Sequence, residues 1–293
     1  MMTHLALCSH KRPENVLIVG GGDGGILREV CRDPLVKHIT LVEIDHMVIE
    51  VAKQYLQKIV PSYIFDDPRL EIVHADGAAF MQELAQATVT STVDDEEDNF
   101  DSSDTLEQEL RRGNSNGPNR RRTKRRRYDV ILADTLDPLG PAESLFEPEF
   151  YEAMHTVLRD DGIICTQGEC FWIHLELIRD LLVCCTDIFD YAEYASTMVP
   201  SAPCGQIGFI LARKAGNHHL HRGSFVARSF KMPERAPTFQ SDLRWYNPQL
   251  HQSSFVLPEY IQREIGHLYR HDQMNDGGNE DPTRCFLSEC AIL

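Results

Sequence analysis

The sequence predicts an α/β domain built on a doubly wound, largely parallel sheet. Short apolar runs alternate with longer stretches of helical periodicity along the chain, and strict alternation of strands and helices favours parallel strands joined by crossover helices. Three consecutive glycines, Gly20 to Gly22, follow the first apolar run, and an acid, Glu43, closes the second. Because ligands of such sheets bind at the carboxyl ends of the strands, both features fall where a ligand is expected.

The predicted strands are short apolar runs bounded by turn residues. They cover residues 15–19, 38–42, 70–73, 129–133, 162–166 and 206–211. Between them lie stretches with apolar residues at helical spacing. We expect these helices at 24–34, 46–58, 77–87, 148–158 and 172–188. Gly20, Glu43, Asp76 and Asp134 then lie at or just beyond the carboxyl ends of four strands.

The glycine turn and the acids around it favour a positively charged nucleoside ligand. Glycines let the backbone turn sharply and approach a ligand, and an acid about twenty residues on accepts hydrogen bonds from ribose hydroxyls, as Glu43 is placed to do. Asp23, however, puts a negative charge inside the turn, where a pyrophosphate would be repelled. The pattern points away from NAD and toward a sulfonium nucleoside, such as S-adenosylmethionine or its decarboxylated form.

Five separated motifs occur in a characteristic order along the chain. They are Gly-Gly-Gly-Asp-Gly-Gly at 20–25, Leu-Val-Glu-Ile-Asp at 41–45, Asp76-Gly77, the run 134–146 and Gln-Gly-Glu-Cys at 167–170. Together they resemble the motifs of spermidine synthases, a family of polyamine aminopropyltransferases. The resemblance covers about residues 1–212 and resumes near 245–261. It implies a Rossmann-like sheet of the class I methyltransferase type.

The resemblance also assigns roles on the amine side of the site. Asp134 matches the family's proton acceptor, and Asp134 and Asp137 match its two diamine-binding carboxylates. Gln167 and Glu169 match the Gln-Gly-Glu stretch that lines the same side. The implied reaction moves the aminopropyl group of decarboxylated S-adenosylmethionine to putrescine, giving spermidine and methylthioadenosine.

The nucleoside side is assigned in the same way. Asp23 should hold the amine of decarboxylated S-adenosylmethionine and make the site selective for that form. Glu43 should bind the ribose, and Asp76 with Gly77 should meet the adenine. The turn at Gly21 and Gly22 completes this cofactor-binding set. Decarboxylated S-adenosylmethionine is expected as a co-substrate, with no permanently bound cofactor and no metal.

Asp134 also suits the implied chemistry on physical grounds. An amine with a pKa of about 10, as for lysine, is mostly protonated near neutral pH. A carboxylate at a strand end can bind the ammonium, orient it and accept a proton during attack. The alternative is that Asp134 only caps the following turn, as aspartates commonly do after strands.

The chain departs from the family pattern on the amine side. The family normally has an N-terminal β-domain that supplies substrate-binding residues and part of a dimer interface, and this sequence begins where that domain ends. Ala202 stands in place of a diamine-contacting tyrosine, and Thr135 and Leu136 replace two serines. We expect the diamine and the nucleoside as partners, a homodimer if the N-terminal domain is restored, and no nucleic acid.

Two alternative functions therefore stay open. The first is a noncatalytic family member that keeps the nucleoside site and acts as a regulatory subunit, which the missing domain and Ala202 favour. The second is a methyltransferase acting on a diamine, similar to the putrescine N-methyltransferases that share this scaffold. Asp23 and Glu169 weigh against the second alternative.

Charge and composition divide the chain into parts. Residues 94–109 hold nine acids and residues 111–127 hold nine lysines and arginines, so the net charge of −16 comes from the rest, with 36 acids against 20 bases. Such an acidic surface attracts polycations and repels nucleic acid, although solubility alone would also explain it. The polar segment 88–127 is predicted to be a disordered charged insertion, either solvated or an interaction tail.

The remaining predictions concern organisation and location. Residues 1–213 are expected to form the catalytic domain, 214–269 a C-terminal segment packing on it as a strand–helix unit, and 270–293 a flexible tail. Nine cysteines without a Cys-x-x-Cys motif fit reduced thiols. The histidines of 218–221 fit a solvated loop better than a metal site. We expect a cytoplasmic or nucleocytoplasmic protein, on membranes only if Cys290 is prenylated.

Overall fold

The computed structural model describes residues 1–97, 126–134, 140–202, 204–216, 229–231, 233–237 and 242–269. Most of the predicted charged insertion, Asp137, the histidines of 218–221 and the predicted tail with Cys290 lie outside these residues. Among the helices that are described, none has the length and apolar character needed to cross a membrane.

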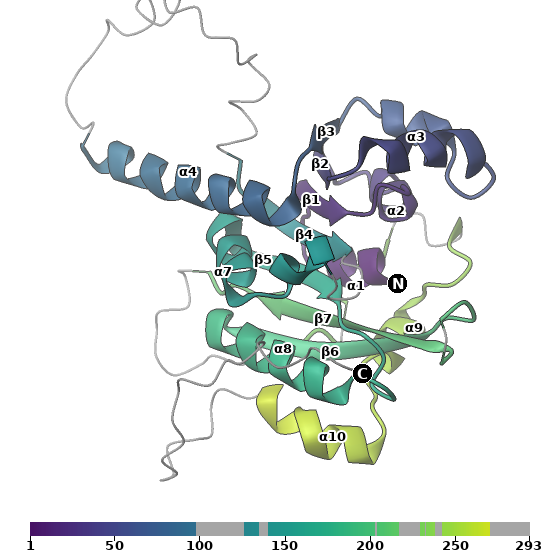
Figure 1. Cartoon of the computed structure of the whole chain (residues 1–293). Coiled ribbons are helices and arrows are strands. Elements are labelled where there is room, and N and C mark those ends of the chain that lie inside the picture. The colour runs from purple at the N-terminus through teal and green to yellow at the C-terminus, as the bar shows by residue number, and fades with distance from the viewer. Residues whose placement is uncertain are drawn as a thin grey trace, which may run out of the picture.

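A seven-stranded sheet organises the chain (Figure 1). Its strands are β1 (Asn15–Gly20), β2 (His38–Glu43), β3 (Leu70–His74), β4 (Tyr128–Asp134), β5 (Leu158–Gln167), β6 (Tyr191–Met198) and β7 (Gln206–Arg213). They lie in the order β3-β2-β1-β4-β5-β7-β6. Strands β1 to β5 pair in parallel, and β7 is antiparallel to both of its neighbours. The prediction of a doubly wound, largely parallel sheet is confirmed.

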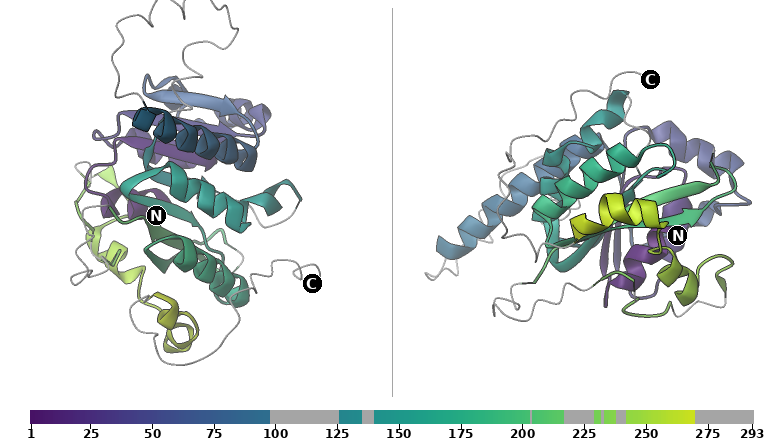
Figure 2. Two further views of the ribbon diagram at one scale, coloured as in Figure 1. Left: turned by 90° about the vertical axis from the view of Figure 1, so that its left-hand side faces the viewer. Right: turned by 90° about the horizontal axis from the view of Figure 1, so that it is seen from below.

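Helices cover both faces of this sheet (Figure 2). One face packs against α1 (Met2–Ser9), α2 (Gly25–Cys31), α3 (His46–Tyr55) and the 3-10 helix η1 (Ser62–Asp66). The other packs against α4 (Gly77–Glu97), η2 (Gly140–Leu145), α7 (Pro148–Val157) and α8 (Leu175–Ile188). Alternate residues of β1 point to opposite faces of the sheet. Val16 and Ile18 belong to the core on the face with α1, and Leu17 and Val19 to the core on the face with α4.

Helix α1 and strand β6 are among the elements that were not predicted from the sequence. Helix α1 is buried along its whole length and has no side-chain cap at its N-terminus, so it carries neither an amphipathic pattern nor a start signal. Strand β6 contains Glu193, an acid that is almost fully buried. Its carboxylate accepts hydrogen bonds from the Tyr191 hydroxyl and the Phe230 backbone N–H, and these tertiary partners cannot be inferred from the local sequence.

Helix α4 extends ten residues beyond its predicted end, to Glu97. The expected boundary of the insertion at residue 88 is therefore too early for the backbone. Thr88 is buried, and its hydroxyl donates to the Leu84 carbonyl within the helix. Once a helix is nucleated, each added residue gains a hydrogen bond, so a polar stretch can continue it. In Figure 1 the far end of α4 projects away from the sheet.

The described part of residues 229–269 is helical, not the expected strand–helix unit. It contains α9 (Pro248–Ser253), α10 (Glu259–Ile265) and the 3-10 helix η5 (Gly266–Tyr269). Asn247 accepts a hydrogen bond from the Leu250 N–H and caps α9, so the chain after Trp245 turns into a helix. The segment contacts the core directly, because buried His251 bonds both the Tyr246 hydroxyl and the Phe230 carbonyl.

The buried carboxylate of Asp129 joins the starts of β1 and β4. It accepts hydrogen bonds from the backbone N–H groups of Glu14 and Asn15, at 2.9 and 2.7 Å, and from Arg159.

Asp129→Ala leaves two buried donors unsatisfied, so we expect a loss of about 2–4 kcal/mol of unfolding free energy in urea. Exposed Asp187 on α8 gives the matched control, since Asp187→Ala should change stability by less than about 0.5 kcal/mol. Equal effects of both variants would contradict this role.

Candidate active site at the carboxyl ends of the strands

A cavity of about 420 Å³ opens where β1, β2 and β4 end. It brings together seven of the residues predicted for the site: Gly21, Gly22, Asp23, Glu43, Asp76, Gly77 and Asp134. These residues come from segments spread over more than a hundred positions of sequence, and the parallel register of the strands aligns them. The volume lies within the range of small-molecule sites.

The glycine turn lets two strand ends approach each other closely. In the register of β1 with β4, Gly20 lies opposite Asp134. A Cβ on Gly20 would stand 2.4 Å from the Asp134 carbonyl oxygen, and the φ of 76° at Gly20 is itself unfavourable for other residues. Gly21 also has a positive φ. Glycine at Gly20 is therefore what permits Asp134 to lie against the turn.

Glu43 holds the turn from the neighbouring strand. Its carboxylate is buried and accepts hydrogen bonds from the Gly22 N–H at 2.9 Å and the Asp45 N–H at 3.0 Å. Two of its about four acceptor positions are used in this way. The remaining positions are available to the ribose hydroxyls that the sequence predicts here.

Asp23 and Asp76 each accept a backbone hydrogen bond at the start of a helix while they line the cavity. One Asp23 oxygen accepts from the Gly25 N–H at 2.8 Å, and one Asp76 oxygen accepts from the Ala79 N–H at 2.9 Å. Each carboxylate keeps a second oxygen for a ligand. Asp76 thus performs the turn-forming role considered from the sequence, and that role does not prevent it from meeting a ligand.

The cavity also has an apolar wall that the sequence analysis missed. Ile44, Val48 and Leu145 line it together with the acids. Ile44 and Val48 are exposed to solvent although they are large and apolar, which suits a flat aromatic ring such as a base. Gly77 lies close to the sheet, since a Cβ there would meet Val19 at 2.6 Å. The signal available from the sequence was Ile44 itself, an apolar residue directly beyond a strand end.

Asp134 has the most perturbed carboxyl group of the cavity. Burial, which is the largest cause, and the nearby negative charges of Asp23 and Glu43 together raise the pKa of Asp134 to about 6. A carboxyl group whose pKa lies near neutral pH can exchange a proton at physiological pH. The arrangement is a half-buried proton acceptor surrounded by negative charge, which attracts a cation and repels an anion.

Comparison with known proteins agrees with this geometry. The model of the spermine/spermidine synthase domain matches residues 1–110 and 115–221. Spermidine synthase 2 of Arabidopsis thaliana is 35% identical over 90% of this chain, and spermidine synthase of Dictyostelium discoideum is 36% identical over 90%. This chain spans 66% and 75% of the lengths of these two relatives.

This chain belongs to the spermine/spermidine synthase family. Solved spermidine synthases share its fold. A structure of spermidine synthase in complex with the transition-state analogue AdoDATO has a TM-score of 0.67 and 28% identity, and covers 91% of this chain and 74% of its own. The enzyme from Thermotoga maritima has a TM-score of 0.64 and 27% identity.

Two of the residues that the family resemblance assigns to the amine, Gln167 and Glu169, lie at and just after the end of the strand next to β4. Gln167 ends β5, the strand next to β4. Glu169 follows with a positive φ, is buried, and lies 3.5 Å from His174. The Tyr194 hydroxyl donates to the Glu169 carbonyl at 2.8 Å and fixes this segment. Neither Gln167 nor Glu169 belongs to the set that lines the cavity, and Asp137 lies outside the described residues.

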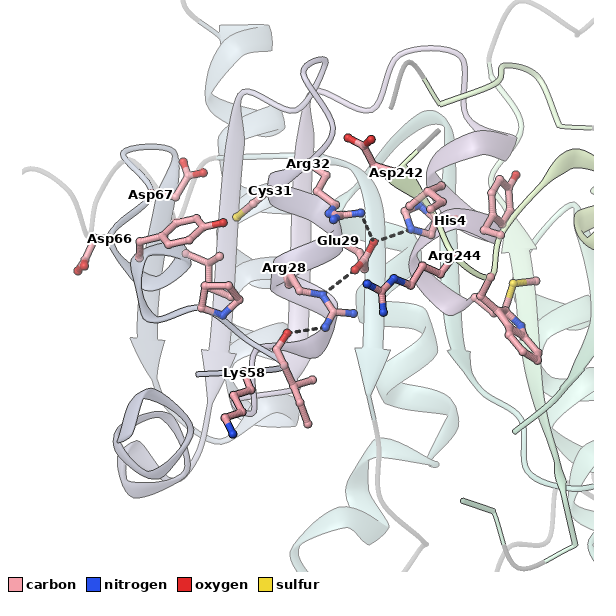
Figure 3. Close-up of a pocket in the computed structure, with 18 of the residues that line it drawn as sticks. His4, Arg28, Glu29, Cys31, Arg32, Lys58, Asp66, Asp67, Asp242 and Arg244 are labelled. Atoms are coloured by element: carbon pink, nitrogen blue, oxygen red, sulfur yellow. Dashed lines mark hydrogen bonds and ion pairs between the residues drawn. The ribbon is translucent and has the colours of Figure 1, made fainter. Parts of the chain in front are cut away.

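A second, larger cavity of about 880 Å³ lies elsewhere, between α1, α2, η1 and residues 242–246 (Figure 3). Its charged groups largely satisfy one another, because Glu29 accepts from His4 and Arg28 and also pairs with Arg32. None of the carboxylates of the strand-end cavity lines it.

The raised pKa of Asp134 predicts a pH-dependent cost to stability. The carboxyl is neutral in both states below the pKa of the unfolded chain, so the cost is absent at low pH. It grows as pH rises from the unfolded-state value of 3.8 to the folded-state pKa of about 6, because in this range the unfolded chain has lost the proton that the folded chain still holds, and it is fully present above that range. We expect Asp134→Asn to raise the urea unfolding free energy at pH 8 by roughly 1–3 kcal/mol, and by less at pH 5. A variant less stable than the parent at pH 8 would show that Asp134 mainly caps the turn.

Proposed function

We propose that this chain transfers the aminopropyl group of decarboxylated S-adenosylmethionine to putrescine, giving spermidine and methylthioadenosine. The observation that carries the proposal is the position of Asp134, with its pKa raised to about 6, between the acids of a nucleoside-sized cavity. A family member with this fold, named as a spermidine synthase, binds a transition-state analogue. Both substrates carry positive charge, and four carboxylates, those of Asp23, Glu43, Asp76 and Asp134, line the cavity.

The donor fits the cavity as follows. The adenine lies between the apolar wall and the segment that begins at Asp76, and the ribose hydroxyls bond Glu43. The free oxygen of Asp23 faces the donor's amine. A carboxylate in that position would repel the carboxylate of ordinary S-adenosylmethionine, so the like charge selects against the undecarboxylated form.

The reaction needs a deprotonated amine beside the donor. The nitrogen attacks the carbon next to the sulfonium, a carbon–nitrogen bond forms, and the carbon–sulfur electron pair leaves on sulfur as a neutral thioether. The attacking nitrogen loses a proton, which Asp134 accepts in its ionised form. A carboxyl pKa near 6 leaves Asp134 mostly ionised at neutral pH while keeping it a stronger base than an ordinary aspartate.

The acceptor is placed between Asp134 and the segment after β5. Gln167 ends β5, the strand next to β4, and Glu169 follows it. With Asp137 they are our candidates for the far ammonium of the diamine. Ala202, in the turn between β6 and β7, leaves open the space that a tyrosine fills in the family pattern. We propose putrescine as the acceptor, with a longer polyamine as the competing acceptor.

Assembly and location follow the family expectation. We propose a homodimer when an N-terminal β-domain is present and a cytoplasmic or nucleocytoplasmic location. Size-exclusion chromatography with light scattering on a chain carrying that domain tests the first, and microscopy of a tagged chain tests the second.

Product chromatography with Asp134→Asn tests the proposed reaction. The parent chain should form spermidine from the two substrates, and the variant should lose about a hundredfold or more of kcat, since general-base groups contribute that order. Its affinity for methylthioadenosine, measured by calorimetry, should stay within a few-fold. The kcat/KM of the parent should fall below pH 6 as Asp134 is protonated.

Other outcomes would identify the alternatives. Nucleoside binding without turnover, with putrescine or spermidine and also after an N-terminal β-domain is restored, would favour a regulatory subunit. A methylated diamine formed from S-adenosylmethionine would establish a methyltransferase.

Asp23→Asn tests the choice between the two forms of the donor. Removing the charge should weaken binding of decarboxylated S-adenosylmethionine and strengthen binding of S-adenosylmethionine. The ratio of the two affinities should therefore fall by about tenfold, as for the loss of one charge-assisted contact. The amide keeps an oxygen for the Gly25 N–H, so this hydrogen bond within the turn survives. Competition calorimetry with both ligands measures the ratio, and an unchanged ratio would remove Asp23 from this role.

A further inference from the structure

Two cysteines meet at the edge of the amine side. Cys170 follows Glu169 in the segment after β5, and Cys204 lies in the turn between β6 and β7. Their Sγ atoms are 2.7 Å apart, although 34 residues separate them in sequence. Both are free cysteines in the structure. A disulfide bond has a length of about 2.05 Å, so the sulfur atoms would need to move only slightly to form one.

Hydrogen bonds bring the two segments that carry these cysteines side by side. The Phe171 N–H donates to the side chain of Gln206 at 3.2 Å, and the Gly168 N–H donates to the Gly208 carbonyl at 2.9 Å. The turn itself is closed by the Gly205 N–H, which donates to the Ala202 carbonyl at 2.9 Å. The approach of the two sulfur atoms is thus built into the fold on both sides.

The two thiols differ in access to solvent. Cys170 is buried, and burial raises the pKa of its thiol, as does the hydrogen bond with Cys204. Backbone N–H groups of Trp172 and Ile173 oppose this shift. Cys204 is only partly buried, so it is the thiol that an incoming reagent meets first. An accessible thiol beside a buried resolving thiol is the arrangement found in redox-sensitive pairs.

We propose that Cys170 and Cys204 form a reversible disulfide by exchange with a small-molecule disulfide such as oxidised glutathione, and that this bond restricts access of the amine. The Cys204 thiolate attacks one sulfur of the small disulfide, which forms a mixed disulfide and releases one thiolate. The Cys170 thiolate then attacks the Cys204 sulfur and expels the second. Two protein thiols are oxidised, the small disulfide is reduced to two thiols, and the protons pass to the released thiolates.

The position of the bond explains its effect, which rests on the proposed function. Cys170 adjoins Glu169, and Cys204 lies two residues from Ala202. Both neighbours border the space proposed for the diamine. A disulfide bond between the segment after β5 and the turn before β7 fixes the distance between these two sides of the proposed diamine space. The nucleoside cavity does not include either segment, so donor binding is unaffected.

Oxidation of the full chain tests this proposal. After treatment with oxidised glutathione, tandem mass spectrometry should locate a Cys170–Cys204 bond in the parent, which dithiothreitol removes. The kcat/KM for putrescine should fall about tenfold or more, because small displacements of positioning groups cost at least that order, and it should recover on reduction. Affinity for methylthioadenosine should stay the same. Cys204→Ser should form no such bond and should be insensitive to the oxidant.

Cys31→Ser is the matched control, since Cys31 is partly buried like Cys204 but lies at the end of α2, and it should respond as the parent does. If no Cys170–Cys204 bond forms under conditions that oxidise glutaredoxin-type thiols, the proposed disulfide is wrong. A bond that forms without changing the kinetics for putrescine would overturn its regulatory role. If the reduced chain has no turnover, the proposed function fails, and the bond is still tested by mass spectrometry.

Discussion

The convergence of carboxylates at one end of the sheet is the constraint on which the site depends. Gly20 brings β1 against Asp134 on β4, and Glu43 binds the glycine turn from β2. Burial of its carboxyl and, after it, the negative charges of Asp23 and Glu43 raise the pKa of Asp134 from 3.8 to about 6, which corresponds to roughly 3 kcal/mol between its two protonation states. The fold tolerates this cost, because two large apolar cores stabilise the sheet on either face.

A cationic ligand relieves that cost. Sulfonium and ammonium groups placed among Asp23, Glu43 and Asp134 would turn repulsion into attraction, whereas an anionic nucleotide would increase it. Specificity against the wrong ligand therefore comes from like charge as much as from complementary contacts. The same acids prepare Asp134 to accept a proton, so ligand selection and proton transfer share one electrostatic origin.

Much of this site could be read from the sequence, because glycines and acids at strand ends have local signatures. The strand β1, its glycine turn and the acid of β2 were predicted from residues 15–45. Strand β6 could not be predicted, since its buried Glu193 is explained by partners 36 and 37 residues away. The apolar wall at Ile44 and Val48 was missed because exposed apolar residues are common and show their role only beside a cavity.

Helix α1 was harder still to predict. All eight of its residues are buried, including the polar residues Thr3, His4 and Ser9, so no periodicity marks it as a helix. The pair Cys170 and Cys204 depends on the pairing of β5 with β7, which no local pattern specifies. Its possible oxidation is compatible with the reduced thiols expected from composition, because an exchangeable pair rests in the reduced state.

The most direct test of the electrostatic account is the pKa of Asp134, measured by carbon-13 NMR in the free chain and with decarboxylated S-adenosylmethionine bound. The account predicts a value near 6 in the free chain and a lower value in the complex, because the positive groups of the ligand stabilise the carboxylate. An ordinary value in the free chain, or a value that does not fall on binding, would contradict it.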